Sequence, residues 1–493
     1  MRRLGLAVAI AMMFAAAPGC GGGGSSTPGP PQARGTASPT GTPIPKSSPT
    51  PQASPTPGSL ASLKHLIFFI QENRSFDSYF GTYPGADGFP NPLPCLPSVW
   101  YPSQCFTPFL NHADSNGGGP YNANFQLADI DNGKMDGFQI QAELEYQNQF
   151  GCPPPNARHG GPPPLVIDDD EEVGPHFTPC VPDVMGYHDG TDLPNYWAWA
   201  GAYTLQDHFF ESTFSSSHPA HLELFSLWAA VCSQLSPPVV GSCRGNADPG
   251  NIWSKELPTP YLWTDLTYLM NKHGVTWKAY LDGGLGGLHG NSQVTTLWDV
   301  LPGFQTVQQD HQLPNAENYT DVNFLSDAAN GTLPAVSWVL PNYNDSEHPQ
   351  ADVSAGEAYL TKMIDAVMAG PDWNNTAIFI THDDIAGFYD HVPPPYTFDN
   401  LGLGIRVPAL IISPWVKRGY IDRQVCSTDC YAKLIEDDFM NGARLRSAGR
   451  LDPRIVYRDE LPEYGNLVND FDFQSPPRPA LILRPYPLSK LRR

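Results

Sequence analysis

Two apolar, strand-like runs in this chain are each followed directly by side chains that carry oxygen donors. The runs are Leu66–Ile70 and Ala377–Thr381, far apart along the sequence. In an α/β sheet the carboxyl ends of neighbouring strands meet at one crevice, and ligands bind there. We therefore expect the polar residues after both runs to meet around one metal ion. The predicted ligands are Glu72, Asn73, Asp383 and Asp384.

The donor atoms of these four side chains are all oxygens. Oxygen donors favour a hard divalent cation, Mg²⁺, Ca²⁺ or Mn²⁺, over Zn²⁺. Either pair alone has a plainer interpretation, because acidic residues after a strand often cap the next helix. Two such pairs, each at the end of its own strand, favour a metal or catalytic site.

The other apolar runs alternate with helical patterns. This alternation predicts the fold class: α/β, with a central, mostly parallel sheet and helices on both faces. Segment Asn91–Asp183 is rich in Pro, Gly and Asn, and we expect it to form a disulfide-stapled loop insertion over the carboxyl edge of the sheet. The other predicted strands are Tyr203–Asp207, Thr276–Tyr280, Ala335–Leu340 and Val407–Ile412, and the predicted helices are Tyr261–Lys272, Gly356–Met368 and Cys430–Met440.

The N-terminal segment predicts export. Residues 1–20 carry two arginines, an apolar run too short to span a bilayer, and small residues that end in Cys20. This resembles a lipoprotein signal, in which Cys20 becomes lipid-modified and anchors the protein to the outside of a bacterial cell membrane; ordinary secretion is the alternative. Residues 21–58, dominated by Gly, Ser, Thr and Pro, predict a disordered linker. The folded domain is expected over 59–474, followed by a basic, Pro-rich tail, 475–493.

Cysteine usage agrees with export. Of the nine cysteines, those other than Cys20 form an even set, which in an exported protein favours disulfides. The connectivity does not follow from the sequence, and the simplest arrangement joins sequence neighbours. Those pairs are Cys95 with Cys105, Cys152 with Cys180, Cys232 with Cys243, and Cys426 with Cys430.

The charge of the chain bears on its partners. A formal net charge of -22 argues against nucleic acid, because phosphate backbones are bound by basic patches. An anionic small substrate stays compatible with this charge, because a bound metal ion inverts the local field.

A serine and two histidines are candidates for the chemistry. Residues Ser215–Ser217 precede a predicted helix, 222–231, so a hydroxyl lies where the helix N-terminus favours anions. A metal-activated serine can attack phosphorus, although serines at such positions are often simple helix caps. His348, or His391 beside the second acidic pair, could protonate a leaving oxygen or hold a phosphoryl group; a lone histidine is more often structural. Weaker candidates are His188, His208, His218 and His221.

With these residues assembled, the chain resembles the bacterial phosphoesterase family that contains phosphatidylcholine-hydrolysing phospholipases C and a group of acid phosphatases, a branch of the alkaline phosphatase-like superfamily. The resemblance covers roughly residues 62–445 and rests on sequence blocks in a fixed order. These blocks are Glu72–Asp77, Gly133–Phe138, Val184–Asp189, Leu205–His208, Ser217–Leu222, Ser346–Pro349, Thr381–Val392 and Gly404–Leu410.

The resemblance implies roles for the candidate residues. It implies that Ser217 is the nucleophile and a metal ligand, and that His348 and His391 lie near the phosphoryl site. It also implies that the metal is bound by Glu72, Asn73, Asp383 and Asp384. The chain departs from the family pattern at Tyr121 and at Ile385-Ala386, and it lacks a histidine often found near residues 423–429. These departures concern the substrate pocket and the general acid.

The expected function is therefore that of an exported, metal-dependent phosphoesterase, phospholipase C-like, that forms a phosphoseryl intermediate on Ser217. Acid phosphatase activity on phosphomonoesters is one alternative. The other is a catalytically impaired surface binding protein with the same fold, motivated by the departures at Tyr121 and Ala386. The expected partners are a phospholipid or small phosphate ester, and a membrane reached through lipid at Cys20.

Overall fold

The computed structural model describes residues 58–148, 152, 182–245, 259–282, 298–395, 402–448 and 453–485 of the 493-residue chain. The predicted signal segment 1–20, with Cys20, and residues 21–57 of the predicted linker lie outside these ranges. Within the described ranges, no helix is long and apolar enough to cross a membrane.

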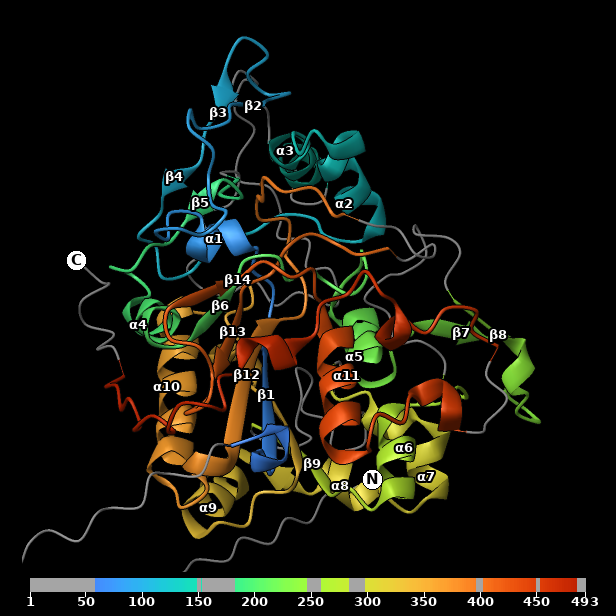
Figure 1. The fold of residues 1–493 in the computed structure, drawn as a ribbon. Coiled ribbons are helices and arrows are strands. Elements are labelled where there is room, and N and C mark those ends of the chain that lie inside the picture. Colours follow the sequence, from blue (N-terminus) through green and yellow to red (C-terminus); the bar gives the residue numbers. More distant parts are fainter. Residues whose placement is uncertain are drawn as a thin grey trace, which may run out of the picture. The chain divides into compact units, whose positions relative to one another are not determined.

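An eight-stranded sheet forms the centre of the fold, with strand order β10-β9-β11-β1-β12-β13-β6-β14 (Figure 1). Neighbouring strands are parallel except where β13 runs antiparallel to β12 and β6. The predicted mostly parallel sheet is therefore confirmed. The strands are β1 (His65–Gln71), β6 (Thr204–Gln206), β9 (Trp277–Leu281), β10 (Tyr319–Thr320), β11 (Val336–Leu340), β12 (Thr376–His382), β13 (Ala409–Ile412) and β14 (Tyr420–Asp422).

Strands β1 and β12 lie side by side in the middle of the sheet, and both are buried along nearly their whole length. A strand covered on both faces is apolar on both, which is why these two are visible in the sequence as continuous apolar runs. In their parallel register Gln71 is paired with His382. The next residues, Glu72 and Asp383, therefore leave the sheet at the same level.

Helices cover both faces of the sheet, as predicted. α10 packs with α9 beside one face, and α5 packs with α11 beside the other (Figure 1). α6 begins later than predicted because Asp265 is its N-cap and accepts hydrogen bonds from the backbone N–H groups of Thr267 and Tyr268. The helices are α1 (Phe76–Phe80), α2 (Ala123–Ile130), α3 (Phe138–Asn148), α4 (Pro194–Ala202), α5 (Ser217–Ser226), α6 (Leu266–His273), α7 (Gln305–Gln309), α8 (Leu313–Glu317), α9 (Asp321–Asn330), α10 (Val353–Ala369) and α11 (Thr428–Phe439).

The predicted helix over residues 222–231 is wrong in its position. α5 begins at Ser217, directly after the extended backbone of Ser216. It ends at Leu227, whose left-handed backbone (φ +57°) stops the helix. Apolar side chains continue past this stop, so the sequence pattern does not reveal it. The chain then forms a hairpin of β7 (Ala230–Cys232) and β8 (Cys243–Gly245).

The predicted loop insertion contains more regular structure than expected, because α2 and α3 lie in it (Figure 1, top). Its contact with the sheet edge is direct: the backbone N–H of Gly119 donates to the carbonyl oxygen of Ala386, 2.8 Å away, in the loop after β12. The insertion therefore lies over the carboxyl edge, as predicted. Its short strands are β2 (Leu96–Pro97), β3 (Cys105–Phe106) and β4 (Phe109–Leu110), and β4 pairs with β5 (Gly186–Tyr187).

Disulfides join sequence neighbours, as the simplest pairing predicted. The bridges within the described residues are Cys95–Cys105, Cys232–Cys243 and Cys426–Cys430. Cys152 is also disulfide-bonded, while Cys180 lies outside the described residues. The first bridge joins the β2–β3 pair of the insertion.

The first part of the predicted tail docks on the domain. The guanidinium of Arg478 donates to the backbone carbonyls of Ser413 and Val416. Leu481 and Leu483 pack against the main hydrophobic core. Residues 475–485 thus continue the fold beyond the expected boundary at residue 474.

Candidate active site

The ends of β1 and β12 bring the four predicted ligands together. The backbone N–H of Asn73 donates to Oδ1 of Asp383 over 3.2 Å, and the side-chain amide of Asn73 donates to Oδ1 of Asp384. One oxygen of Glu72 and one of Asp383 lie within 4.8 Å of each other. All four side chains belong to buried residues, the most exposed being Asp383 at 7%. The expected convergence is thus present, and the role as metal ligands stays a prediction.

Unusual backbone geometry builds this site. Asn73, the second residue after β1, has a left-handed backbone (φ +58°), and so do Glu347 (φ +69°) and Ala386 (φ +41°) in the adjacent loops. Asn tolerates the left-handed backbone region better than most residues, whereas residues with longer or branched side chains are disfavoured there. Such conformations persist only where surrounding packing enforces them, and they gather at functional sites.

Ser217 lies at the first position of α5 with its hydroxyl directed at the acidic group. Its Oγ donates to Oδ2 of Asp384 over 3.3 Å, and a hydrogen bond from Ser217 also acts on the Glu72 carboxylate. The N-cap of α5 is Ser216, whose side chain makes no capping hydrogen bond. The simple capping role considered for these serines therefore does not describe Ser217.

His221 is the site residue that sequence reasoning undervalued. Its Nε2 lies 3.2 Å from Oε1 of Glu72 and 3.7 Å from Oδ2 of Asp383. Its Nδ1 lies 2.5 Å from the carbonyl oxygen of Trp298, so Nδ1 carries the hydrogen. Once α5 begins at Ser217, the two residues are four positions apart on a helix and share one face. The four-residue spacing of Ser217 and His221 was the sequence signal that could have identified His221 as a site residue.

The donor atoms around His221 fit a cation. Burial lowers the pKa of His221, so the imidazole is neutral, and with Nδ1–H bonded to a carbonyl its Nε2 presents a lone pair to two carboxylates. Metal-bound histidines are held in the same way by a backbone carbonyl. Glu72 Oε2, Asp383 Oδ2 and Asn73 Oδ1 are buried and make no hydrogen bond with the described residues. A divalent cation would satisfy these atoms together.

The electrostatics of the site also favour a bound cation. Burial, and then the charge of Asp383, raise the pKa of Glu72 well above its ordinary value. The same causes in the same order raise the pKa of Asp384. Glu211, a further buried carboxyl, has its pKa raised by burial and by the charge of Asp384. So much buried negative charge is unfavourable without a positive partner.

His348 lies in a loop that is held firmly beside the site. The preceding Glu347 is fully buried, and the backbone N–H of Glu72 donates to the carbonyl oxygen of Ser346 over 2.8 Å. Burial lowers the pKa of His348 to about 4, and Asp383 also acts on it electrostatically. The Glu347 carboxylate is bonded by Gln71 (3.2 Å), Tyr79 (2.7 Å), Tyr196 (2.9 Å) and His382 (3.1 Å).

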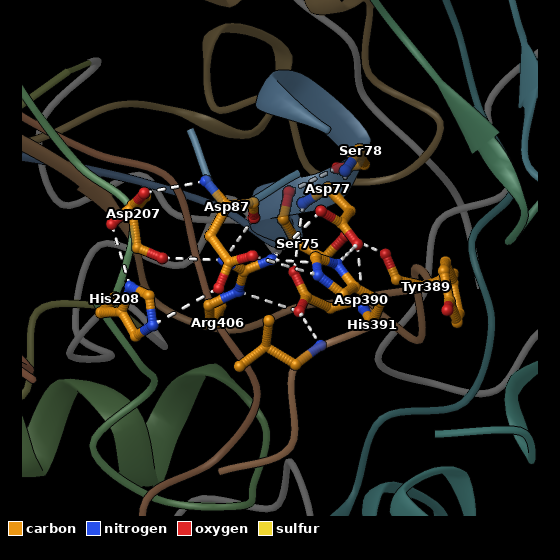
Figure 2. Close-up of polar contacts among 11 residues, drawn as sticks. Ser75, Asp77, Ser78, Asp87, Asp207, His208, Tyr389, Asp390, His391 and Arg406 are labelled. Atoms are coloured by element: carbon orange, nitrogen blue, oxygen red, sulfur yellow. Dashed lines mark hydrogen bonds and ion pairs between the residues drawn. The ribbon is translucent and has the colours of Figure 1, made fainter. Parts of the chain in front are cut away.

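His391 lies in a different polar cluster (Figure 2). Its Nδ1 is 2.7 Å from Oδ2 of Asp77, and Arg406 pairs with Asp77 over 3.1 Å and with Asp390 over 2.9 Å. Asp77, Asp390 and His391 are spaced closely enough to hold a cation, but the guanidinium already compensates both carboxylates. Among the described contacts of His391, none involves Ser217 or the predicted metal ligands.

The departures from the family pattern leave the ligand geometry in place. Ala386 acts through its backbone: its N–H donates to Oδ1 of Asp384 over 3.1 Å, and its carbonyl accepts from Gly119. Tyr121 packs partly buried against the core. The side-chain amide of Gln126 donates to the carbonyl oxygens of both Tyr121 and Ser215, which ties this position to the serine loop.

The fold is α/β, and the candidate site lies at the carboxyl edge of its mostly parallel sheet. Residues 63–440 match the Phosphoesterase family. The chain therefore belongs to that family and, with it, to the hydrolases that act on phosphoester bonds.

Curated relatives of the chain are named as bacterial phospholipases C. A non-hemolytic phospholipase C of Burkholderia pseudomallei is 26% identical over 85% of this chain and 60% of its own length. Phospholipase C B of Mycobacterium tuberculosis is 26% identical over 86% of this chain and 80% of its own. A hemolytic phospholipase C of Pseudomonas aeruginosa is 24% identical over 78% and 53%. The chain thus spans between about half and four fifths of the length of these relatives.

Solved structures resemble part of the fold. A phosphonate monoester hydrolase of Agrobacterium radiobacter matches 50% of this chain and 69% of its own, with 13% identity and a TM-score of 0.28. A protein of the alkaline phosphatase superfamily from Vibrio parahaemolyticus matches 54% and 65%, with 11% identity and a TM-score of 0.32.

Proposed function

We propose that this protein is a metal-dependent phosphoesterase that uses Ser217 as its nucleophile and forms a phosphoseryl intermediate. One observation carries the proposal: the Ser217 hydroxyl lies 3.3 Å from Asp384, beside buried oxygens of Glu72, Asn73 and Asp383 that have no hydrogen-bond partner among the described residues. Glu72, Asn73, Asp383, Asp384 and Ser217 would hold the cation. His221 adds a nitrogen donor, so among the ions expected from oxygen donors alone, Mn²⁺ suits the set better than Mg²⁺ or Ca²⁺.

The first half of the reaction is carried by Ser217. A bound divalent cation would supply positive charge that favours the serine alkoxide and offsets charge on the phosphoryl oxygens. The hydrogen bond to Asp384 orients the Ser217 hydroxyl. As Oγ bonds to phosphorus its proton would pass to Asp384, the bond from phosphorus to the leaving oxygen breaks, and that oxygen takes up a proton from water.

His348 suits the second half of the reaction, the hydrolysis of the phosphoseryl intermediate. Its Nδ1 lies 3.1 Å from the carbonyl oxygen of Pro349, which places the hydrogen on Nδ1 and leaves Nε2 as an acceptor. With its pKa lowered to about 4, the imidazole is neutral near neutral pH. A neutral imidazole with a free Nε2 is a general base: it would take a proton from the water that attacks phosphorus and releases Ser217.

Phospholipid is the substrate class that the relatives favour, because those at 24–26% identity are named as phospholipases C. The same residues would hydrolyse phosphomonoesters, so the substrate has to be measured. The convergence of Ser217 with the acidic residues speaks against an impaired binding protein. Export, and lipid attachment at Cys20, are part of this proposal and rest on the sequence pattern.

The test compares hydrolysis of p-nitrophenyl phosphate and p-nitrophenyl phosphorylcholine by the full chain, with and without a chelator. We expect activity that the chelator removes and that Ser217→Ala lowers by several orders of magnitude. Ser216→Ala is the matched control, since its Oγ is equally buried but makes no hydrogen bond with the described residues. Equal activity of Ser217→Ala and the wild type would refute the mechanism, and the preferred substrate decides between phospholipase and phosphatase.

A further inference from the structure

Arg74 is a buried cation that the proposed mechanism does not yet use. It directly follows the predicted ligand Asn73 and is only 1% exposed. Its guanidinium carbon lies 4.6 Å from the ring centroid of Phe388 and 5.9 Å from that of Tyr79. Phe388 belongs to the loop after β12 that carries Asp383 and Asp384. The guanidinium therefore lies between the two segments that build the metal site.

The described residues leave most of the hydrogen-bond donors of Arg74 without an acceptor. None of its three nitrogens has a close hydrogen-bond partner among them. The Tyr79 hydroxyl gives its own proton to Glu347 over 2.7 Å, and its oxygen receives a weak hydrogen bond from Arg74. Leaving the donors of a buried guanidinium without acceptors is costly, and native proteins rarely do so without a reason.

Arg406 shows what a structural arginine looks like in the same protein. It is buried to the same degree, at 0% exposure. Its guanidinium pairs with Asp77 and Asp390 and donates to the carbonyl oxygens of Asp87 and Asp207 at 2.9 and 2.8 Å (Figure 2). The donors of Arg406 are thus satisfied entirely by the chain, whereas most donors of Arg74 have no acceptor among the described residues and remain available to a ligand.

The surroundings of Arg74 indicate what kind of ligand its donors would bind. Arg74 and Asp383 both act electrostatically on His348, so the guanidinium lies near the proposed general base and a proposed metal ligand. A guanidinium is charged at any working pH, so Arg74 supplies a permanent positive charge at this position.

We propose that Arg74 binds the non-bridging phosphoryl oxygens of the substrate and holds the phosphorus atom against Ser217. A planar guanidinium can form two parallel, charge-assisted hydrogen bonds to a phosphoryl group, which fixes its orientation as well as its charge. The Phe388 ring, whose centroid lies 4.6 Å from the guanidinium carbon, helps to hold the guanidinium in place through a cation–π contact. This assignment rests on the proposed function, because it places the ligand of Arg74 in the same site as Ser217.

The experiment measures binding of inorganic phosphate to the full chain loaded with Mn²⁺, by calorimetry, beside steady-state hydrolysis of p-nitrophenyl phosphate. Arg74→Met removes the charge and the donors while keeping an apolar stem. We expect the Kd for phosphate to rise roughly 10- to 100-fold, with a fall in kcat/KM at least as large. Arg74→Lys keeps the positive charge but cannot form the two parallel hydrogen bonds of a guanidinium. Its phosphate affinity should therefore fall by a smaller factor than its kcat. Metal affinity, titrated separately, should stay unchanged in both variants.

The outcomes separate this inference from the proposed function. Unchanged phosphate affinity in a folded Arg74→Met protein overturns the inference, even if the wild type is an active phosphoesterase. If Arg74→Met does not fold, Arg74→Lys decides, because wild-type phosphate affinity and kcat in that variant would show that the two parallel hydrogen bonds are not used. If the wild type is inactive, weaker phosphate binding by Arg74→Met in the Ser217→Ala background still supports the inference, and equal binding overturns it.

Discussion

At the scale of single residues, the orientation of His221 is the most informative detail of the site. A neutral imidazole whose lone pair faces two ionised carboxylates is repelled by both unless a cation lies between them. His218, on the same helix, differs: burial lowers its pKa to about 3, and its Nε2 lies 3.0 Å from the Tyr261 hydroxyl, which can donate to it. Two buried histidines three positions apart are therefore expected to play different roles.

This contrast gives a matched pair of variants. We expect His221→Gln to weaken the affinity for Mn²⁺ by at least about 10-fold, because a nitrogen donor is lost from the site. His218→Gln should leave that affinity within error of the wild type. Calorimetric titration of the chelator-treated protein measures both. Equal loss in the two variants would mean that helix α5 was disturbed and that His221 has no particular role.

A second residue-scale prediction concerns His348 as the base. His348→Asn should slow the release of phosphate from Ser217 more than its formation, so that a burst of p-nitrophenol precedes a slow steady state. Because the base must be deprotonated and its pKa is lowered to about 4, wild-type kcat should fall only as the pH drops to about 4 or below. Rapid-mixing kinetics across this range provide the measurement. A rate that rises as the pH falls through this value would assign the opposite role, general acid, to His348.

At the scale of elements, the cluster around His391 ties α1 and the following loop to the loops after β6 and β12. His391 Nδ1 bonds Asp77 in α1, its Nε2 lies 3.6 Å from Asp87, and the Nε2 of His208 lies 3.5 Å from Asp87 (Figure 2). Carboxylates and imidazoles thus alternate, with Arg406 at the buried end. The arrangement compensates charge at each step, which favours a structural role over a place at the phosphoryl group.

The pH dependence of stability tests this structural role. Burial lowers the pKa of His391, but the hydrogen bond and charge of Asp77 outweigh it, so the folded-state pKa is raised. Its contribution is therefore complete below the unfolded pKa, about 6.5, and is lost as the pH rises through the folded value. Relative to wild type, His391→Asn should lose roughly 1 kcal/mol at pH 5.5 and less at pH 9. Denaturant unfolding measures it, with His311→Asn, an exposed histidine, as the control. A difference that grows with pH would contradict the assignment.

At the scale of the whole molecule, the sequence predicts what depends on one segment and misses what depends on several. β1 and β12 are visible in the sequence because central parallel strands are apolar throughout. Since the two strands run in the same direction, the residues that follow them, Glu72 and Asp383, come together without further information. The end of α5 is invisible because apolar residues continue past Leu227 into β7, so the sequence pattern places the helix too far along the chain. The role of His221 stays hidden with it, and the partners of Glu347 and Arg74 come from separate segments that only tertiary folding assembles.

The proposed metal site should also govern the stability of the entire domain. Without a cation, Glu72 and Asp384 have raised pKa values, so each favours the folded state when protonated and opposes it once the pH exceeds its unfolded value, about 4. A bound ion reverses this, because it binds the carboxylate form. The thermal midpoint of the chelated protein should therefore fall from pH 5 to pH 8, while that of the Mn²⁺-loaded protein changes little. At a free ion concentration about 100 times Kd, the ion should add about 2.7 kcal/mol. Scanning calorimetry at both pH values measures the gap, and a gap that narrows with rising pH would argue that these carboxylates bind no cation.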